Sequence, residues 1–106
     1  MDVVEAMLKL GFNRPTAVVY NYMLKHPDGY EIDIEHKTGL RQPEVSIAIR
    51  ELLHRDWIIL DPRRVHNSRG RPRNYYYFSK EKAAEDIKKL IDAKIGELKD
   101  IRSIWK

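Results

Sequence analysis

A glycine turn in the middle of the chain separates two stretches with helical patterning, and this arrangement restricts the fold more than any other feature. The first stretch is short, because Asp33 is a good N-cap and Thr38-Gly39 closes a helix over residues 34–37. The second has Pro43 in its first turn and then apolar residues at helical spacing: Val45, Ala48, Ile49, Leu52 and Leu53. This helix should end near Asp56, which tolerates a left-handed backbone. Two helices joined by a tight glycine-containing turn form a helix-turn-helix.

Two further helices are predicted before this motif. Residues 2–10 form a short amphipathic pattern that ends at Gly11. Asn13 can cap a second helix, with Pro15 in its first turn. Its apolar residues are Val18, Val19, Tyr22 and Met23. This helix should stop at the sequence HPDG, where Asp28-Gly29 indicates a turn.

Two strand-like runs, WIIL at residues 57–60 and YYYF at residues 75–78, follow the helix-turn-helix. They predict a β-hairpin, and a hairpin in this position is a wing. Because side chains alternate along a strand, either Tyr75 and Tyr77 or Tyr76 and Phe78 must face the core. We expect the other pair to pack against the C-terminal helix, with stacking on unpaired bases as the alternative.

The positive charge of the chain is concentrated in this hairpin. The net charge is +4, and residues 62–80 hold six basic residues and no acidic one. They are Arg63, Arg64, Arg69, Arg71, Arg73 and Lys80, which leaves 14 basic and 16 acidic residues elsewhere. Such a patch on a near-neutral body usually meets a polyanion, because each phosphate contact releases condensed counterions. A solvated loop is the alternative.

Residues 80–106 are predicted to form one long helix with a wide apolar stripe. Its heptad-like positions are Ala84, Ile87, Ile91, Leu98, Ile101 and Trp105, and Leu90, Ile95 and Ile104 widen it. We expect the stripe to pair with that of a second copy, and folding back across its own domain is the alternative. The dimerisation residues would be Ile87, Ile91, Leu98, Ile101 and Trp105.

Catalysis and metal binding find no support in the sequence. There is no cysteine, and the four histidines show no metal-ligand spacing. Phosphate-binding loops, dinucleotide fingerprints and nucleophile elbows are also missing, so we expect a non-enzymatic binder without cofactor or metal. No run nears the roughly 20 apolar residues of a membrane span. A cytoplasmic protein without a membrane partner is therefore expected.

Several of these motifs resemble those of known regulators. LGFNRPTAVVYNYMLKH and TGLRQPEVSIAIRELLHRDWII resemble the winged helix-turn-helix of archaeal TrmB-like transcriptional regulators, and GRPRNYYYFS is similar to the wing of MarR- and PadR-type regulators. The match covers roughly residues 8–80, and the glycine common before the first strand is Asp56 here. TrmB-like regulators also have a large C-terminal sugar-binding domain that this chain lacks, so the resemblance implies no sugar effector.

The resemblance implies that the helix over residues 42–54 enters the major groove of DNA. Its apolar stripe leaves other side chains pointing outward: Gln42, Glu44, Ser46, Ile47 and Arg50. Glutamine suits an adenine edge, arginine suits guanine or a phosphate, and serine suits either. Ile47 could contact a thymine methyl group or be buried against a neighbouring element. Glu44 could accept from cytosine or favour the helix N-terminus, and Arg41 could hold the flanking backbone.

The wing contains a second resemblance. Arg69-Gly70-Arg71-Pro72 is similar to the core of the AT-hook, a minor-groove motif of A·T-rich DNA. We expect Arg71 in the groove and Arg69 and Arg73 on phosphates. Arg63 and Arg64, at the other base of the loop, could contact the same backbone.

The expected fold class is mainly α with a small β-hairpin (α+β). Residues 1–79 would form a winged helix-turn-helix and residues 80–106 a dimerisation helix. The expected function is that of a homodimeric, sequence-specific regulator of transcription that binds double-stranded DNA. Its recognition helices would read half-sites about 34 Å apart. A winged-helix protein–protein interaction module and a non-specific architectural DNA-binding protein are the alternatives.

Overall fold

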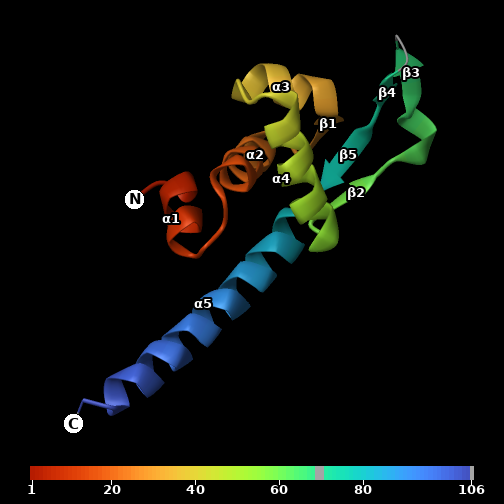
Figure 1. Cartoon of the computed structure of the whole chain (residues 1–106). Helices are drawn as coiled ribbons and strands as arrows, with labels where there is room; N and C mark the ends of the chain where they lie inside the picture. Colours follow the sequence, from red (N-terminus) through yellow and green to blue (C-terminus); the bar gives the residue numbers. More distant parts are fainter. Residues whose placement is uncertain (69–70, 106) are drawn as a thin grey trace.

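The computed structural model describes residues 1–68 and 71–105, with the side chains of residues 1–65 and 73–105. The chain is mainly helical, with two small antiparallel sheets (Figure 1). The helices are α1 (Val3–Lys9), α2 (Arg14–Lys25), α3 (Glu31–Thr38), α4 (Gln42–His54), the 3-10 turn η1 (Pro62–Arg64) and α5 (Lys80–Ser103). The strands are β1 (Asp28–Tyr30), β2 (Ile58–Leu60), β3 (His66–Ser68), β4 (Arg71–Arg73) and β5 (Tyr75–Phe78). The predicted fold class is confirmed.

Local chemistry fixes most helix ends. Asp2 caps α1, and Asn13 caps α2 by accepting a hydrogen bond from the Thr16 backbone N–H at 2.9 Å. Gly39 ends α3 with a positive φ of 73°, and Asp56 follows α4 with a φ of 59°. Both positions agree with the sequence. The turn at Gly39 brings α3 and α4 together, and α2 packs across α4 and α1.

The segment between α2 and α3 differs from the prediction. A turn at Asp28-Gly29 and an N-cap at Asp33 were expected, but residues 28–30 form strand β1 and α3 already begins at Glu31. The reason is pairing with a distant segment, since β1 lies antiparallel to β5 with Tyr30 opposite Tyr75. Asp33 lies in the first turn of α3 instead, where its charge suits the helix dipole.

The main sheet has the order β1-β5-β2. Tyr76 and Phe78 belong to the core, where Phe78 packs edge-on against Tyr20. On the other face, Tyr75 contacts the rings of Tyr30 and Tyr77. Tyr75 and Tyr77 therefore pack within the sheet, rather than against α5 as predicted. The core unites the helices and this sheet; its fully buried large side chains include Trp57, Met23, Ile34, Leu52 and Ile58.

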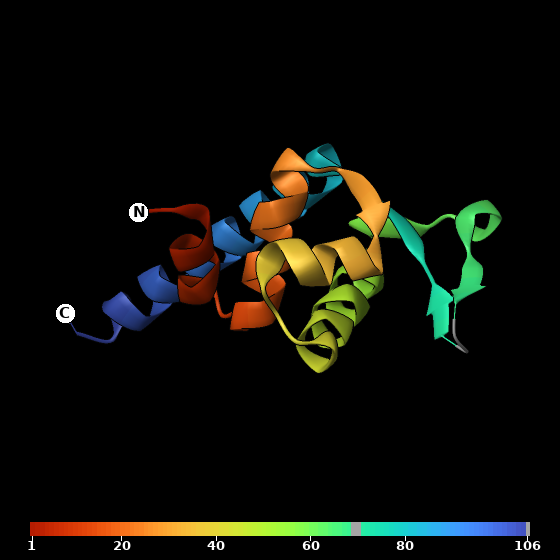
Figure 2. The ribbon, with the colours of Figure 1, turned by 90° about the horizontal axis from the view of Figure 1, so that it is seen from above.

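Two elements extend from opposite ends of this body. The β3-β4 hairpin continues from the sheet on one side, and α5 runs away from the body on the other (Figures 1 and 2). The molecule measures 63 × 23 × 22 Å along its principal axes. Ala83 is buried and Ile87 packs against the core, whereas every described residue from Lys88 onward is exposed. The helix ends at Ser103, so Trp105 follows it instead of completing its last turn as predicted.

Candidate nucleic-acid interface

Helix α4 presents a polar face away from the core. Val45, Ala48, Ile49 and Leu52 are buried, as the helical spacing predicted. The Nε2 atom of Gln42 donates a hydrogen bond to Ser46 Oγ at 2.9 Å. This bond orients the Gln42 amide. Arg50 lies two turns after Gln42 and is exposed.

Glu44 supports the start of α4. One of its carboxylate oxygens accepts a hydrogen bond from the Arg41 backbone N–H at 3.1 Å and lies 3.7 Å from Arg41 Nε. The side chain of Arg41 remains 89% exposed, so this pairing is weak and leaves the guanidinium accessible to other anions. Of the two predicted roles for Glu44, the structure supports the helix N-terminus.

Ile47 lies in the middle of the exposed face of α4. It is 47% exposed, so burial against a neighbouring element, one of the two predicted alternatives, is not seen. Pro43, one turn earlier, is exposed as well. The crest of the helix thus holds two apolar side chains between polar ones.

A hollow separates α4 from the base of the wing. Its volume is about 410 Å³, and it is lined by Glu31, Gln42, Ser46, Ile49, Arg50, Leu53, Asn74 and Tyr76. Asn74 holds its wing side, because its carbonyl oxygen accepts from the Glu31 backbone N–H at 2.9 Å and its side-chain amide donates to Tyr76 Oη at 3.3 Å. Sequence reasoning missed Asn74, and the available signal was its position directly before the YYYF run.

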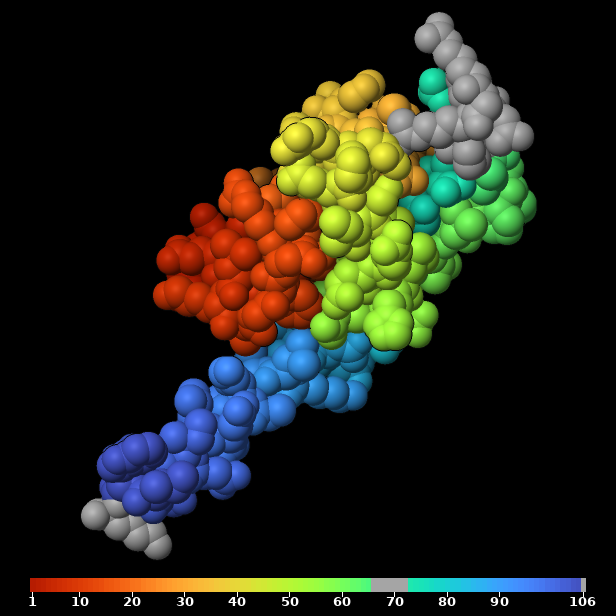
Figure 3. Space-filling model, in the orientation of Figure 1, coloured from red at the N-terminus to blue at the C-terminus, as the bar shows by residue number. Residues whose placement is uncertain are grey.

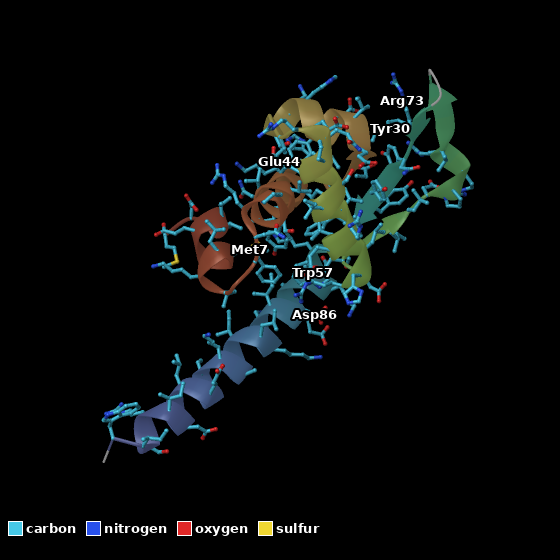
Figure 4. All side chains as sticks on the ribbon, in the orientation of Figure 1. Met7, Tyr30, Glu44, Trp57, Arg73 and Asp86 are labelled. Carbon is cyan, nitrogen blue, oxygen red and sulfur yellow. The ribbon has the colours of Figure 1, made fainter. Side chains whose placement is uncertain are left out.

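The β3-β4 hairpin lies at the end of the molecule opposite to α5 (Figure 1). Strands β3 and β4 pair antiparallel, with Arg73 opposite His66 and Arg71 opposite Ser68. Arg73 is exposed, and Figure 4 shows it near the end of the hairpin. Arg69 and the side chain of Arg71, both predicted to contact DNA, lie outside the described residues.

Arg63 and Arg64 are placed differently from Arg73. Both lie in η1 and face the buried carboxylate of Asp61, at 3.3 Å for Arg63 Nε and 3.7 Å for Arg64 Nε. Tyr77 Oη donates to the same carboxylate at 3.2 Å, and the Arg64 guanidinium stacks on the Tyr75 ring at 4.5 Å. Asp61 immediately precedes residues 62–80, the segment without acidic residues. Counting charges only within that segment therefore missed Asp61.

The carboxyl group of Asp61 stays ionised in this setting. Desolvation by burial would raise its pKa, but hydrogen bonds from Arg63 and Tyr77 outweigh that effect and hold the pKa below its usual value. One negative charge is therefore shared by two arginines at the base of the wing. Among the described arginines of the wing, Arg73 lies further along the chain, at the end of β4, and is exposed.

The predicted dimerisation residues divide into two groups. Ile87 is partly buried against the core of its own chain. Ile91, Leu98, Ile101 and Trp105 are 38%, 54%, 44% and 76% exposed. Figure 3 shows the second half of α5 standing clear of the rest of the molecule. An apolar stripe in this setting is uncovered within a single chain.

The remaining surface offers little chemistry. Among the side chains that the structure describes, no three metal-ligating groups gather into a cluster. None of the described helices is long and apolar enough to cross a membrane.

Comparison with known proteins finds a shared fold but assigns the chain to no family. No family model matches the chain, and no curated protein matches it either. A solved structure described as a possible transcriptional regulator from Methanosarcina mazei Go1 is similar over 97% of this chain and 88% of its own, with a TM-score of 0.71 and 17% identity. At this identity the likeness establishes a shared fold. The resemblance to TrmB-like regulators stays a prediction from the sequence.

Proposed function

We propose that this protein is a sequence-specific regulator of transcription that binds double-stranded DNA as a homodimer. Residues 1–79 would bind DNA, with α4 in the major groove and the wing on the minor groove or backbone. Residues 80–106 would pair with a second copy. The similar Methanosarcina mazei protein is a possible transcriptional regulator, and this supports a regulatory role.

The observation that carries this proposal is the position of the hollow between α4 and the wing. Gln42, Ser46 and Arg50 line one side of it and Asn74 lines the other. All four side chains donate hydrogen bonds to phosphate or base oxygens in known complexes. A phosphate backbone that runs through this hollow would bring the major groove to α4 and the next groove to the β3-β4 hairpin.

The distribution of charge supports the same orientation. Arg41, Arg50 and Arg73 are exposed around α4 and the hairpin. Each arginine that contacts a phosphate releases counterions, so binding should weaken steeply with salt. Arg63 and Arg64 would act from the base of the wing. Arg69 and Arg71 would extend the contact at its end, with Arg71 in the minor groove.

The exposed stripe on α5 supports the proposed homodimer. Its exposed apolar residues lie on a helix that contacts the core only through its first turns. Large apolar patches rimmed by polar residues mark interaction sites, and twofold dimers are the commonest oligomers. Two copies would place two recognition helices on one pseudo-palindromic operator.

A titration with double-stranded DNA tests the proposal. Fluorescence anisotropy of a labelled random duplex is measured with the full chain at about 50 mM and 200 mM salt, followed by selection from a random duplex pool. A regulator should bind the random duplex at both salt concentrations, with lower affinity at the higher one, and selection from the pool should recover a palindromic motif. A protein–protein interaction module should bind neither, and an architectural protein should bind without recovering a motif.

A further inference from the structure

We infer that Ile47 reads the C5-methyl group of a thymine, so that each half-site of the operator contains a thymine at the position facing the middle of α4. This inference rests on the proposed function, since it names what the same helix recognises. It begins from an apolar side chain on the exposed face of α4, which apart from Ile47 and Pro43 is polar.

The geometry of α4 places Ile47 where a base edge would be met. With 3.6 residues per turn, Ile47 lies roughly opposite the buried side chains of Val45 and Leu52. Pro43, one turn earlier, shares this crest and is also exposed. A helix that enters the major groove directs its crest at the floor of the groove, where the bases present their edges.

The chemistry of the groove then selects the partner. Hydrogen-bond donors and acceptors dominate the major-groove edges of the four base pairs, and the thymine methyl group is the apolar feature they offer. Ile47 has no polar atom in its side chain, so contact with that methyl is the favourable interaction open to it there. An exposed isoleucine otherwise gains nothing from water.

The surroundings of Ile47 disfavour a protein partner. Its neighbours along the exposed face of α4 are Ser46, Arg50 and Glu51, which are polar. A stable protein–protein interface needs at least about 1,000 Å² with a contiguous apolar centre. Two apolar side chains among charges are too small for that, whereas one methyl group fits them.

Deoxyuridine substitution isolates this contact, because uracil differs from thymine only by the missing methyl. A duplex is first selected from a random pool with the full wild-type chain. Each thymine is then replaced by deoxyuridine in turn, and dissociation constants are measured for the wild type and for Ile47→Ala. Loss of one buried methyl should weaken wild-type binding about three- to fivefold at one thymine per half-site. Ile47→Ala should bind less tightly and lose this response at that thymine.

Ile59→Ala is the matched control, because Ile59 lies on β2 and is 60% exposed. This variant should respond to deoxyuridine as the wild type does, and circular dichroism checks that both variants are folded. If wild-type affinity is indifferent to every thymine methyl, or if Ile47→Ala responds as strongly as the wild type, the inference is wrong while the proposed function stands. If the wild type binds no duplex, both fall.

Discussion

The indole N–H of Trp57 donates a hydrogen bond of 2.7 Å to the Oδ2 atom of Asp86, and this contact joins the body of the molecule to α5 (Figure 4). Trp57 is fully buried and directly precedes β2. Asp86 lies in the second turn of α5, and Lys82 Nζ approaches the same oxygen at 3.3 Å. Because a buried donor seldom lacks a partner, Asp86 supplies the acceptor that the indole N–H needs and ties the start of α5 to the body.

Asp86→Asn should therefore destabilise the fold in a pH-dependent way. The hydrogen bond from Trp57 holds the pKa of Asp86 below its ordinary value of 3.8 and outweighs desolvation, which raises it. A lowered folded-state pKa means that the carboxylate stabilises the fold above about pH 4 and that this contribution is lost as the pH falls through the folded-state pKa. We expect a lower melting temperature for the variant at pH 7 and a smaller difference from the wild type near pH 2.5.

Asp92→Asn is the control for this experiment. It makes the same chemical change on an exposed part of the same helix. Its melting temperature should stay close to that of the wild type at both pH values. An Asp86→Asn deficit of equal size at pH 7 and pH 2.5 would show that the charge of Asp86 does not contribute.

Asn13→Ala should cost about 1 kcal/mol of unfolding free energy, because it removes the acceptor for the Thr16 backbone N–H at the start of α2. Urea denaturation at one fixed protein concentration measures the change, since oligomerisation would make stability depend on concentration. Asn21→Ala, in the middle of the same helix, should be neutral or slightly stabilising because alanine is the better helix former. Equal losses for the two variants would contradict the capping role.

The sequence predicted those features that local chemistry determines. The cap at Asn13, the left-handed residues Gly39 and Asp56, and the start of α4 beside Pro43 agree with the structure. Each depends on a residue and its neighbours within one helical turn. The helical spacing of apolar residues likewise separated the buried and exposed faces of α4, including the outward position of Ile47.

Features that depend on distant partners were missed. Strand β1 exists because β5 lies beside it, and the hydrogen bond from Tyr75 to Asp28 joins residues far apart in the sequence. Asp61 is likewise held by Tyr77, sixteen positions later. No pattern within a few residues of Asp28 or Asp61 encodes these pairings. The contact of Asp61 with Tyr77 could therefore be seen only in three dimensions, whereas its pairing with Arg63 and Arg64 lies within three residues.

The pairing of Asp61 predicts that the wing arginines contribute unequally to DNA binding. Replacing Arg69 and Arg73 together with Ala should reduce the slope of log K against log salt by about 1.8, or 0.9 for each lost phosphate contact. The double variant of Arg63 and Arg64 should change the slope less, because both guanidinium groups already face the Asp61 carboxylate. Duplex titrations across a salt series give both slopes. A larger change for Arg63 and Arg64 would contradict this order.

Leu98→Glu combined with Ile101→Glu should convert a dimer into a monomer without unfolding it. Both side chains are about half exposed on the part of α5 that stands clear of the body, so charge there disturbs only a partner. Sedimentation equilibrium should show the mass fall from twice 12.6 kDa to 12.6 kDa. Lys99→Glu, an exposed neighbour on the same helix, should leave the dimer intact.

The monomeric variant should also bind a palindromic operator more weakly than the wild type, because linked half-sites raise the effective concentration of the second recognition helix. The contradicting result would be a wild-type mass of 12.6 kDa in the absence of DNA, measured at protein concentrations that saturate the operator. The apolar stripe on α5 would then not mediate dimerisation.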